Sequence, residues 1–262
     1  MKAPVWAQRE PWSTLLERLE AIGLNAVGVT EPDREAAAHG ARSAVVFASG
    51  GSALWDAFVQ AIQADPRVLT EHAHPLDRFI ARQLASLDAI DSGRCWVRCA
   101  HDAERFVDFR PLAQSAGLGW PGRLGLLMHP KFGPWMGLRA VCFTEELLPR
   151  TPALSAPSPC DGCPAPCASA CPTLAVTTDA PFDIRACAAH KQDGGCAGSC
   201  AARNACPAGR TFRYPMLEQN YHDDRRTGRI QLASVLRVGA DGHIGEGPYW
   251  SDWADESPAT ES

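Results

Sequence analysis

The sequence predicts an α+β protein in which a mixed sheet domain precedes a small module rich in cysteine. Three observations support this fold class. Helical stripes of apolar residues alternate with β-branched runs as far as residue 147. Four prolines then fall within residues 148–159, where they fix the backbone and remove hydrogen-bond donors. Beyond them, eight of the eleven cysteines lie within residues 160–206. The expected divisions are a domain over 1–147, a linker over 148–159, the module over 160–210 and a C-terminal extension over 211–262.

The elements of the first domain follow from the spacing of their apolar residues. Leu15, Leu19 and Ile22 stand on one face of a helix that ends at Gly23. Residues 43–49 form a continuous β-branched run, which is typical of a strand buried on both faces. By the same reasoning we expect helices over 53–65, 75–90 and 109–117, and strands over 26–30, 95–100, 124–129 and 138–144.

The region after the cysteine module looks less regular. Residues 207–228 are polar and predict irregular structure, and RIQLASVLRV (229–238) is the first apolar run to follow. The last twelve residues, SDWADESPATES, predict a solvated acidic tail.

Composition limits the classes of function. The formal net charge is −5, which predicts no strong general attraction for nucleic acid. The first residues contain no apolar segment typical of a secretory signal, and no run approaches the ~18 apolar residues of a membrane span. We therefore expect a cytoplasmic protein without a membrane partner. In a reducing compartment, clustered cysteines bind metal more often than they form disulfides.

The cysteines fall into two sets of four, each followed by a proline. The first set has the spacing C-x2-C-x3-C-x3-C-P and the second has C-x8-C-x3-C-x5-C-P. The bacterial ferredoxin run is C-x2-C-x2-C-x3-C-P, and its fourth cysteine binds the other cluster. Two [4Fe–4S] clusters with crossed fourth ligands fit this plan. Zinc, a single cluster and empty sites stay open, because the spacings depart from the standard run. The predicted ligand sets are Cys160, Cys163, Cys167 and Cys206, and Cys187, Cys196, Cys200 and Cys171.

The segment GLGWPG (117–122) matches the dinucleotide-binding pattern G-x-G-x-x-G by letter only. That fingerprint needs a strand before it and a helix after it. Here a helical stretch precedes the segment, Pro121 interrupts it, and a strand is expected to follow. We therefore expect the glycines to allow a close approach of the backbone to a bulky group.

Two resemblances rest on longer motifs. VDFRPLAQSAGLGWPGRLGLLMHP, with CDGCPAPCASACPTLAV and DIRACAAHK further on, resembles the epoxyqueuosine reductase family. HPLDRFIARQL and MHPKFGPWMGLRAV resemble the cobalamin-processing CblC family. Both families share a nitroreductase-like α+β domain that binds a corrinoid. The resemblance thus implies a nitroreductase-like mixed sheet domain followed by a small ferredoxin-like iron–sulfur module.

The resemblance also implies roles for single residues. Asp108 matches the aspartate proposed as proton donor in epoxyqueuosine reductases, although an N-cap before FRPLAQ is an equal alternative. His129 falls where the CblC family lines its corrinoid pocket, with a backbone-bonded histidine as the alternative. For Trp120 and Trp135, the alternative is a role as ordinary aromatic residues of the core. The full set expected to bind the corrinoid is Gly117, Gly119, Trp120, His129, Phe132, Gly133 and Trp135.

The function that these resemblances imply is that of an iron–sulfur oxidoreductase. Two [4Fe–4S] clusters would pass electrons to a bound corrinoid, cobalamin or a related compound. The alternative is a ferredoxin-type electron carrier or a cobalamin-handling chaperone without a substrate of its own. Expected partners are a ferredoxin or flavodoxin with its reductase, and a small-molecule or corrinoid substrate. A tRNA substrate is expected to be unlikely, because the chain is acidic and stops about fifty residues after its last cysteine.

Overall fold

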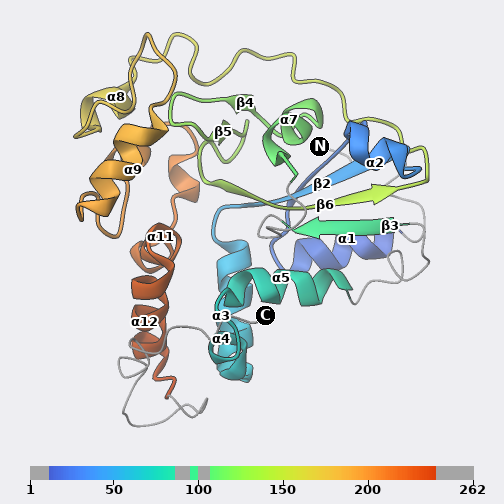
Figure 1. Ribbon diagram of the computed structural model, residues 1–262, viewed down its shortest axis with the longest axis horizontal. Coiled ribbons are helices and arrows are strands. Elements are labelled where there is room, and N and C mark those ends of the chain that lie inside the picture. The colour runs from blue at the N-terminus through green and yellow to red at the C-terminus, as the bar shows by residue number, and fades with distance from the viewer. Residues whose placement is uncertain (1–11, 86–94, 100–106, 240–262) are drawn as a thin grey trace.

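The computed structural model describes residues 12–85, 95–99 and 107–239. A four-stranded antiparallel sheet with the order β1-β2-β6-β3 forms its centre (Figure 1). The strands are β1 (Ala26–Thr30), β2 (Ser43–Gly50), β3 (Cys95–Cys99) and β6 (Met136–Thr144). All eight residues of β2 are buried, because helices cover both faces of the sheet. The mixed α+β fold expected from the sequence is confirmed.

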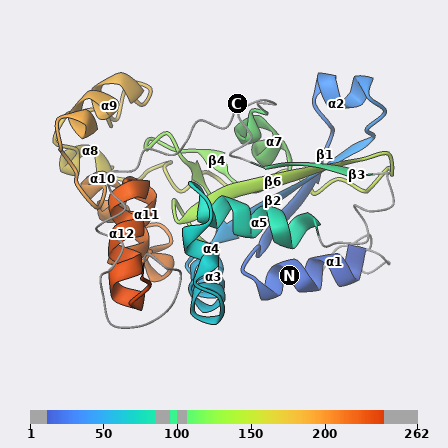
Figure 2. The same cartoon turned by 60° about the horizontal axis from the view of Figure 1, so that its bottom comes forward.

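The helices form a layer on each face of the sheet (Figure 2). One layer packs around Phe47, Phe58 and Cys142, and it contains α1 (Trp12–Ala21), α3 (Ala53–Ala64), α4 (Arg67–Thr70) and α5 (Pro75–Ala85). The other layer contains α2 (Arg34–Ala38) and α7 (Phe109–Ser115). The helix expected over 75–90 ends its described part at Ala85, since residues 86–90 lie outside the described ranges.

The cysteine module lies at one end of the molecule, away from β3 and α1 (Figure 1). It contains α8 (Pro166–Ala170), α9 (Ile184–Gln192), α10 (Ala201–Ala205) and the short helix η2 (Arg210–Phe212). A small hairpin of β4 (Trp120–Pro121) and β5 (Leu127–Met128) reaches it from the first domain. Leu124 and Met128 of this hairpin segment share a small core with Ala165, Cys167 and Ala202 of the module.

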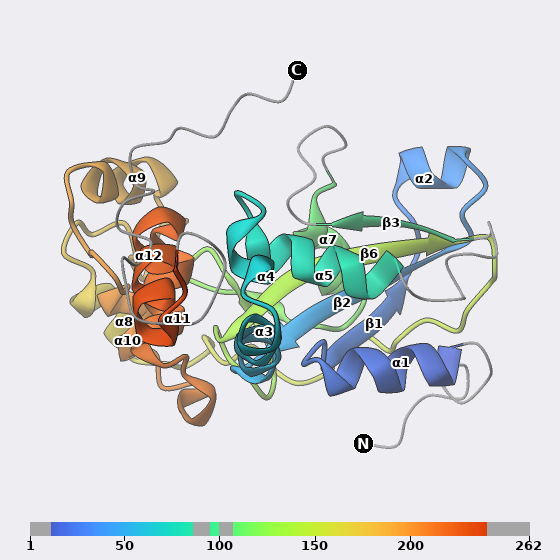
Figure 3. The same ribbon diagram turned by 90° about the horizontal axis from the view of Figure 1, so that it is seen from below.

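The region expected to be irregular forms two helices instead, α11 (Met216–Asp223) and α12 (Arg225–Leu236). The expectation of irregular structure was therefore wrong for residues 216–228, whereas residues 207–209 and 213–215 form neither helix nor strand. Tyr221 and Leu232 explain the difference, because both are buried in the core beneath α3 and α5. Asp224 joins the helices, and its carboxylate accepts the backbone N–H groups of Arg226 and Thr227 as an N-cap. Figure 3 shows α11 and α12 between the module and α3.

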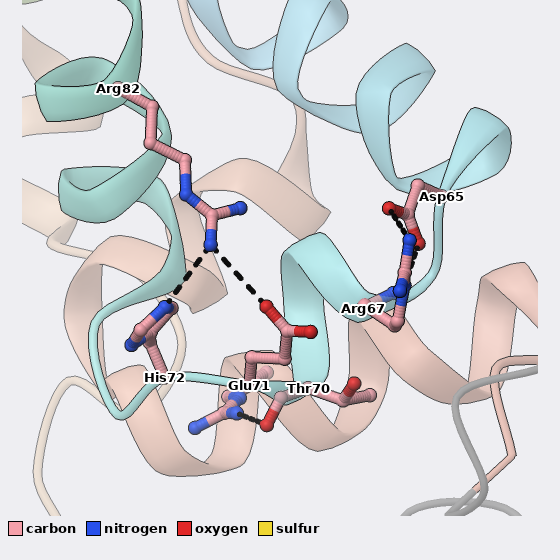
Figure 4. Close-up of polar contacts among 7 residues, drawn as sticks. Asp65, Arg67, Thr70, Glu71, His72 and Arg82 are labelled. Carbon is pink, nitrogen blue, oxygen red and sulfur yellow. Dashed lines mark hydrogen bonds and ion pairs between the residues drawn. The ribbon is translucent and has the colours of Figure 1, made fainter. Parts of the chain in front are cut away.

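Polar contacts tie this C-terminal pair to the first domain at the corner between α4 and α5. Within the first domain, Arg82 of α5 donates to the carboxylate of Glu71 at 3.3 Å and lies 3.4 Å from the His72 ring, which holds this corner together (Figure 4). Arg229 of α12 donates to the carbonyls of Leu69 and Thr70. The carbonyls at the end of α4 would otherwise lack hydrogen-bond donors, and the Arg229 side chain of α12 supplies them.

The proline-rich linker runs as irregular chain along the free edge of β1. Val29 N–H donates to the Thr151 hydroxyl at 2.8 Å, and Thr151 N–H donates to the Val29 carbonyl at 3.0 Å. The division of the chain into domains stays a prediction, since these bonds attach the linker to the sheet.

None of the helices in the described ranges is long and apolar enough to cross a membrane. The longest of them, α3 and α12, have 12 residues each, against about 20 for a membrane span.

Two glycines join the module to the first domain. Gly133 has φ +57° and a Cβ there would lie 2.4 Å from the Ala208 carbonyl oxygen. Gly209 has φ +63° and its Cβ would lie 2.1 Å from the Phe132 carbonyl oxygen. The two segments therefore meet main chain to main chain, and only glycine permits this approach.

Gly133→Ala should weaken this contact. We expect the free energy of unfolding to fall by about 1–2 kcal/mol for the left-handed backbone and by roughly 1–3 kcal/mol more for the overlap with Ala208. Urea denaturation provides the measurement. Gly194→Ala is the matched control, because Gly194 has φ +81° and nothing within 4 Å of its Cβ position. Equal losses in the two variants would contradict the contact.

Candidate functional site

Eight cysteines surround two separate cavities in the module. The first cavity is lined by Cys160, Cys163 and Cys167 from one sequence set and by Cys206 from the other. The second is lined by Cys187, Cys196 and Cys200, together with Cys171. The fourth cysteine of each set therefore lies at the cavity of the other set. Their role as iron–sulfur ligands stays a prediction, and the described residues contain no group of three His, Cys, Asp or Glu side chains arranged around a single metal ion.

Short helices with tight turns bring these thiols together. Cys167 lies in α8, which begins after Ala165 at φ +55°, and α8 packs against α10. Cys200 caps α10, since its sulfur accepts the Arg203 N–H at 3.4 Å, and Cys206 follows that helix directly. The packing of two short helices thus explains how cysteines far apart in the sequence line one cavity.

Several thiols share an electrostatic environment that disfavours ionisation without a cation. Burial raises the pKa of Cys206, and the neighbouring Cys167, Cys160 and Cys163 raise it further. Burial likewise raises the pKa of Cys187, and Cys200, Cys171 and Cys196 add to this effect. Thiolates bind metals, so a positively charged iron–sulfur core would supply the charge that these sites lack. Soft sulfur donors at both cavities fit such a core.

Cys171 differs from the other thiols. Burial alone would raise its pKa, but hydrogen bonds from the Thr173 hydroxyl and from the backbone of Thr173, Val176 and Ala175 outweigh it and lower the pKa. Donors of this kind stabilise a thiolate, and they also surround sulfur ligands in metal sites.

Asp108 lies in an open groove between α7 and the hairpin. It caps α7 by accepting the Arg110 N–H at 3.2 Å, and its side chain is 48% exposed. The helix-cap role is thus present, and it leaves the carboxylate in the groove. Polar side chains of α7 line one side, and the hairpin lines the other with apolar residues that include Pro121 and Leu126.

The groove and the second cysteine cavity share part of their lining. Gly125 and Leu126 at the tip of the hairpin border both. Phe182 of the module packs against Gly125, where a Cβ would lie 2.5 Å from its ring. Leu126 is 37% exposed. Among the described residues, the hairpin tip is thus a shared wall of the carboxylate groove and of the cavity lined by the second set of thiols.

The GLGWPG segment packs against protein. As expected, a helix precedes it and a short strand follows, so it is not a dinucleotide fingerprint. A Cβ on Gly117 would lie 2.8 Å from the Pro152 carbonyl oxygen, and one on Gly119 would lie 2.9 Å from that of Met128. Trp120 pairs with Met128 in the hairpin. Both glycines thus allow a close approach of neighbouring main chain, and their role at a corrinoid stays a prediction.

His129 closes a turn at the end of β5. Its Nδ1 accepts the N–H groups of Lys131 at 3.0 Å and Phe132 at 3.2 Å, so the ring carries its proton on Nε2. Burial and then the nearby Lys131 lower its pKa to about 4. His129 is therefore neutral near pH 7 and bonded to the backbone through Nδ1, while its place in a corrinoid pocket stays a prediction.

The remaining aromatic residues of HPKFGPW are covered by the module. The Phe132 ring lies 4.7 Å from the His129 ring and 4.8 Å from Phe212, measured between centroids. Trp135 is 0% exposed and contacts Tyr214 and the Arg203 guanidinium. Both side chains are thus buried in the structure, Phe132 at 3% and Trp135 at 0% exposure. Their predicted role in binding a corrinoid stays untested.

Sequence reasoning missed several residues around the cysteines. Arg123 of the hairpin donates to the Cys160 carbonyl at 2.7 Å and lines the first cavity. On α11, the half-buried His222 lines the second cavity, and Glu218, one helical turn earlier, is buried. Their spacing of four residues placed them on one face of a helix, but the helix itself had not been predicted.

Comparisons with known proteins support the resemblance to epoxyqueuosine reductases. No family model matches the chain. The epoxyqueuosine reductase of Synechococcus sp. (strain CC9605) is 33% identical over 123 residues, which cover 47% of this chain and 34% of that protein. That of Vibrio cholerae is 38% identical over 120 residues, 45% of this chain and 30% of that protein. The chain thus spans about a third of the length of these relatives.

Solved structures support the fold. Epoxyqueuosine reductase from Streptococcus thermophilus matches with a TM-score of 0.53 and 13% identity, over 79% of this chain and 68% of that one. The Bacillus subtilis enzyme, captured with its catalytic aspartate loop swung out of the active site, gives a TM-score of 0.51 at 16% identity, over 78% and 66%. The chain therefore has the α+β fold of epoxyqueuosine reductases. A C. elegans B12-trafficking protein CblC matches with a TM-score of only 0.47 at 13% identity, over 84% and 96%, and carries no argument.

The expectation that tRNA is an unlikely partner was wrong. One structure with this fold is an epoxyqueuosine reductase with an epoxyqueuosine-modified tRNA-Tyr stem loop, at a TM-score of 0.51 and 15% identity, over 79% of this chain and 68% of that one. Net charge describes a whole chain, whereas nucleic acid contacts depend on local charge. The place where this sequence ends also says nothing about its partners.

Stability should depend on pH through His129. The ring binds its proton less readily in the folded chain, with a pKa of about 4 against 6.5. The stability from the neutral ring is therefore complete above about pH 6.5 and is lost as pH falls to about 4, up to roughly 3 kcal/mol. In His129→Asn, whose amide oxygen accepts the same bonds without titrating, the slope of unfolding free energy against pH should shrink. Urea titrations across this range test it, and an unchanged slope would refute it.

Proposed function

We propose that the protein is an iron–sulfur oxidoreductase that reduces an epoxide on a modified tRNA nucleoside, as the similar epoxyqueuosine reductases are named for doing. The observation that carries the proposal is the shared wall of Gly125 and Leu126. The groove lined by Asp108 and the cavity lined by four thiols meet at this wall. A reductive reaction needs both a source of electrons and a source of protons, and the two are neighbours at this wall.

The cysteine arrangement supports iron–sulfur clusters over separate zinc sites. Each cavity takes three thiols from one sequence set and one from the other. This is the exchange of fourth ligands that two-cluster ferredoxins make. Two zinc sites built from paired C-x2-C arms would not match, because this module has a single C-x2-C arm, Cys160 and Cys163. The cysteines would hold the clusters, which supply single electrons when bound.

Asp108 would supply a proton. Removal of an epoxide oxygen as water consumes two electrons and two protons, and it leaves an alkene. The Asp108 carboxyl faces the groove from the N-cap of α7 and lies 3.5 Å from the Arg110 guanidinium. Arg110 would orient the carboxyl, and the apolar hairpin side would exclude water from one flank of the substrate.

Transfer of electrons through a bound corrinoid is the finer part of this proposal. Its support is the resemblance of GLGWPG and HPKFGPW to the corrinoid-binding families. No step of the chemistry above depends on it. Titration of the protein with hydroxocobalamin, followed by absorbance, tests it, and no binding at about 100 μM, well above the micromolar affinity of about −8 kcal/mol expected for a resident cofactor, would remove it.

The cluster proposal predicts about eight iron atoms per chain after anaerobic reconstitution, four for each cluster. Cys206→Ala should disturb the site that contains Cys160, and Cys171→Ala should disturb the site that contains Cys187. Iron and sulfide analysis with electron paramagnetic resonance of partly reduced samples separates the two. Cys142→Ala, a buried thiol in β6, is the control and should keep all the iron. Stoichiometric zinc with negligible iron would contradict the cluster proposal.

The proton-donor role predicts that Asp108→Asn lowers reduction of an epoxyqueuosine-modified tRNA stem loop by about 100-fold or more. Stability should stay unchanged, because asparagine caps helices as well as aspartate does. Mass spectrometry of the nucleoside follows the loss of one oxygen. Asp33→Asn, at the equivalent cap of α2, is the matched control and should retain activity. Full activity in Asp108→Asn would refute the role, and iron-loaded wild type without any activity would favour an electron carrier.

A further inference from the structure

Glu218 belongs to a buried polar cluster between α10, α11 and the start of α3. In the part of the chain that the structure describes, four buried side-chain atoms have no hydrogen-bond partner. All four gather here, and they are Trp135 Nε1, Arg203 Nε, Glu218 Oε2 and His222 Nε2. Buried polar atoms without partners are costly, so their concentration in one place indicates a function or bound water.

The geometry links these groups into one unit. His222 Nε2 lies 3.8 Å from Glu218 Oε1, one helical turn along α11. The Arg203 guanidinium carbon lies 4.4 Å from the centre of the Trp135 ring and 4.8 Å from that of Tyr214. Arg203 also donates to the Pro134 carbonyl at 2.7 Å, which fixes its position.

Glu218 is the titratable member of this unit. Glu218 is 2% exposed. Burial raises its pKa to about 7, although a hydrogen bond from Ser52 lowers it in part. His222 stays neutral, because burial and then the nearby arginines lower its pKa to about 3. The charged and titratable groups that face Glu218 are Asp56 of α3, Arg139 of β6, Arg203 of α10, Tyr214 before α11 and His222 of α11 itself.

The same unit borders the second cysteine cavity. Arg203 and His222 both line that cavity, whereas Glu218 stands behind them. The Arg203 N–H bonds to the sulfur of Cys200, and Asp223 at the end of α11 accepts the Gly198 N–H at 3.0 Å. A negative charge added at this cavity would act on Glu218 through protein of low polarity, where such interactions are strong.

We propose that Glu218 is a buried proton site that takes up one proton when the second cysteine site gains one electron. The inference rests on the proposed iron–sulfur function. The electron comes from an external reductant such as dithionite, and the proton passes from solvent to the Glu218 carboxylate. The reverse transfer returns the proton when the electron leaves for the substrate. One electron and one proton thus enter the module together, which suits a reaction that consumes both.

The test is a potentiometric titration of the iron-loaded protein at several pH values, followed by electron paramagnetic resonance. The midpoint potential of the second site should fall as pH rises through neutrality, approaching a tenfold change in the reduction equilibrium per pH unit, or about 59 mV. Glu218→Gln should flatten this dependence. Glu145→Gln, an exposed glutamate, is the matched control and should keep it.

A second measurement uses the wild-type protein, so its result does not depend on whether the Glu218 variant folds. Reduction in weak buffer should take up close to one proton per electron at the second site. Cys171→Ala, which retains the first site, should lose this uptake. A pH-independent potential or reduction without proton uptake would overturn the inference while leaving the proposed function intact. Absence of iron would overturn both.

Discussion

The arrangement of the whole molecule depends on the contact between the backbones of Gly133 and Gly209. Neither position has room for a Cβ, so the HPKFGPW turn and the chain after Cys206 lie against each other without side chains between them. The contact continues into the sheet, because the Phe132 ring lies against Gly50 at the end of β2. It therefore fixes the cysteine module relative to the sheet through rigid main chain.

Further contacts between the module and the first domain lie close to the cavities. Arg203 lies over the Trp135 ring, and the hairpin inserts Leu124 and Met128 into the core of the module. The hairpin tip then becomes a wall with the carboxylate groove on one side and thiols on the other. Catalytic groups from two parts of a chain can act together only if their spacing is held to within a fraction of an ångström, and packed main chain provides this.

Local patterns in the sequence predicted what local physics controls. The stripe of Leu15 and Leu19 gave a helix, and the Cys-Pro endings predicted which thiols would share a cavity, although their ligand role is untested. Tertiary contacts determined the structure where local patterns did not predict it. The polar residues of MLEQNYHD (216–223) predicted a loop, yet Tyr221 and Glu218 are buried and the segment is a helix. Trp135 suits a ligand wall and a protein core equally, so its residue type alone did not predict that its side chain is completely buried.

The bonds between Thr151 and Val29 have a consequence for how copies of this protein meet. β1 is the edge of the sheet, and an uncovered edge offers N–H and C=O groups to strands of other molecules. The linker occupies part of that edge with a segment in which prolines cannot extend the ladder further. A single stretch of chain thus both connects the module and guards the sheet, and cleavage within it would expose a surface prone to self-association.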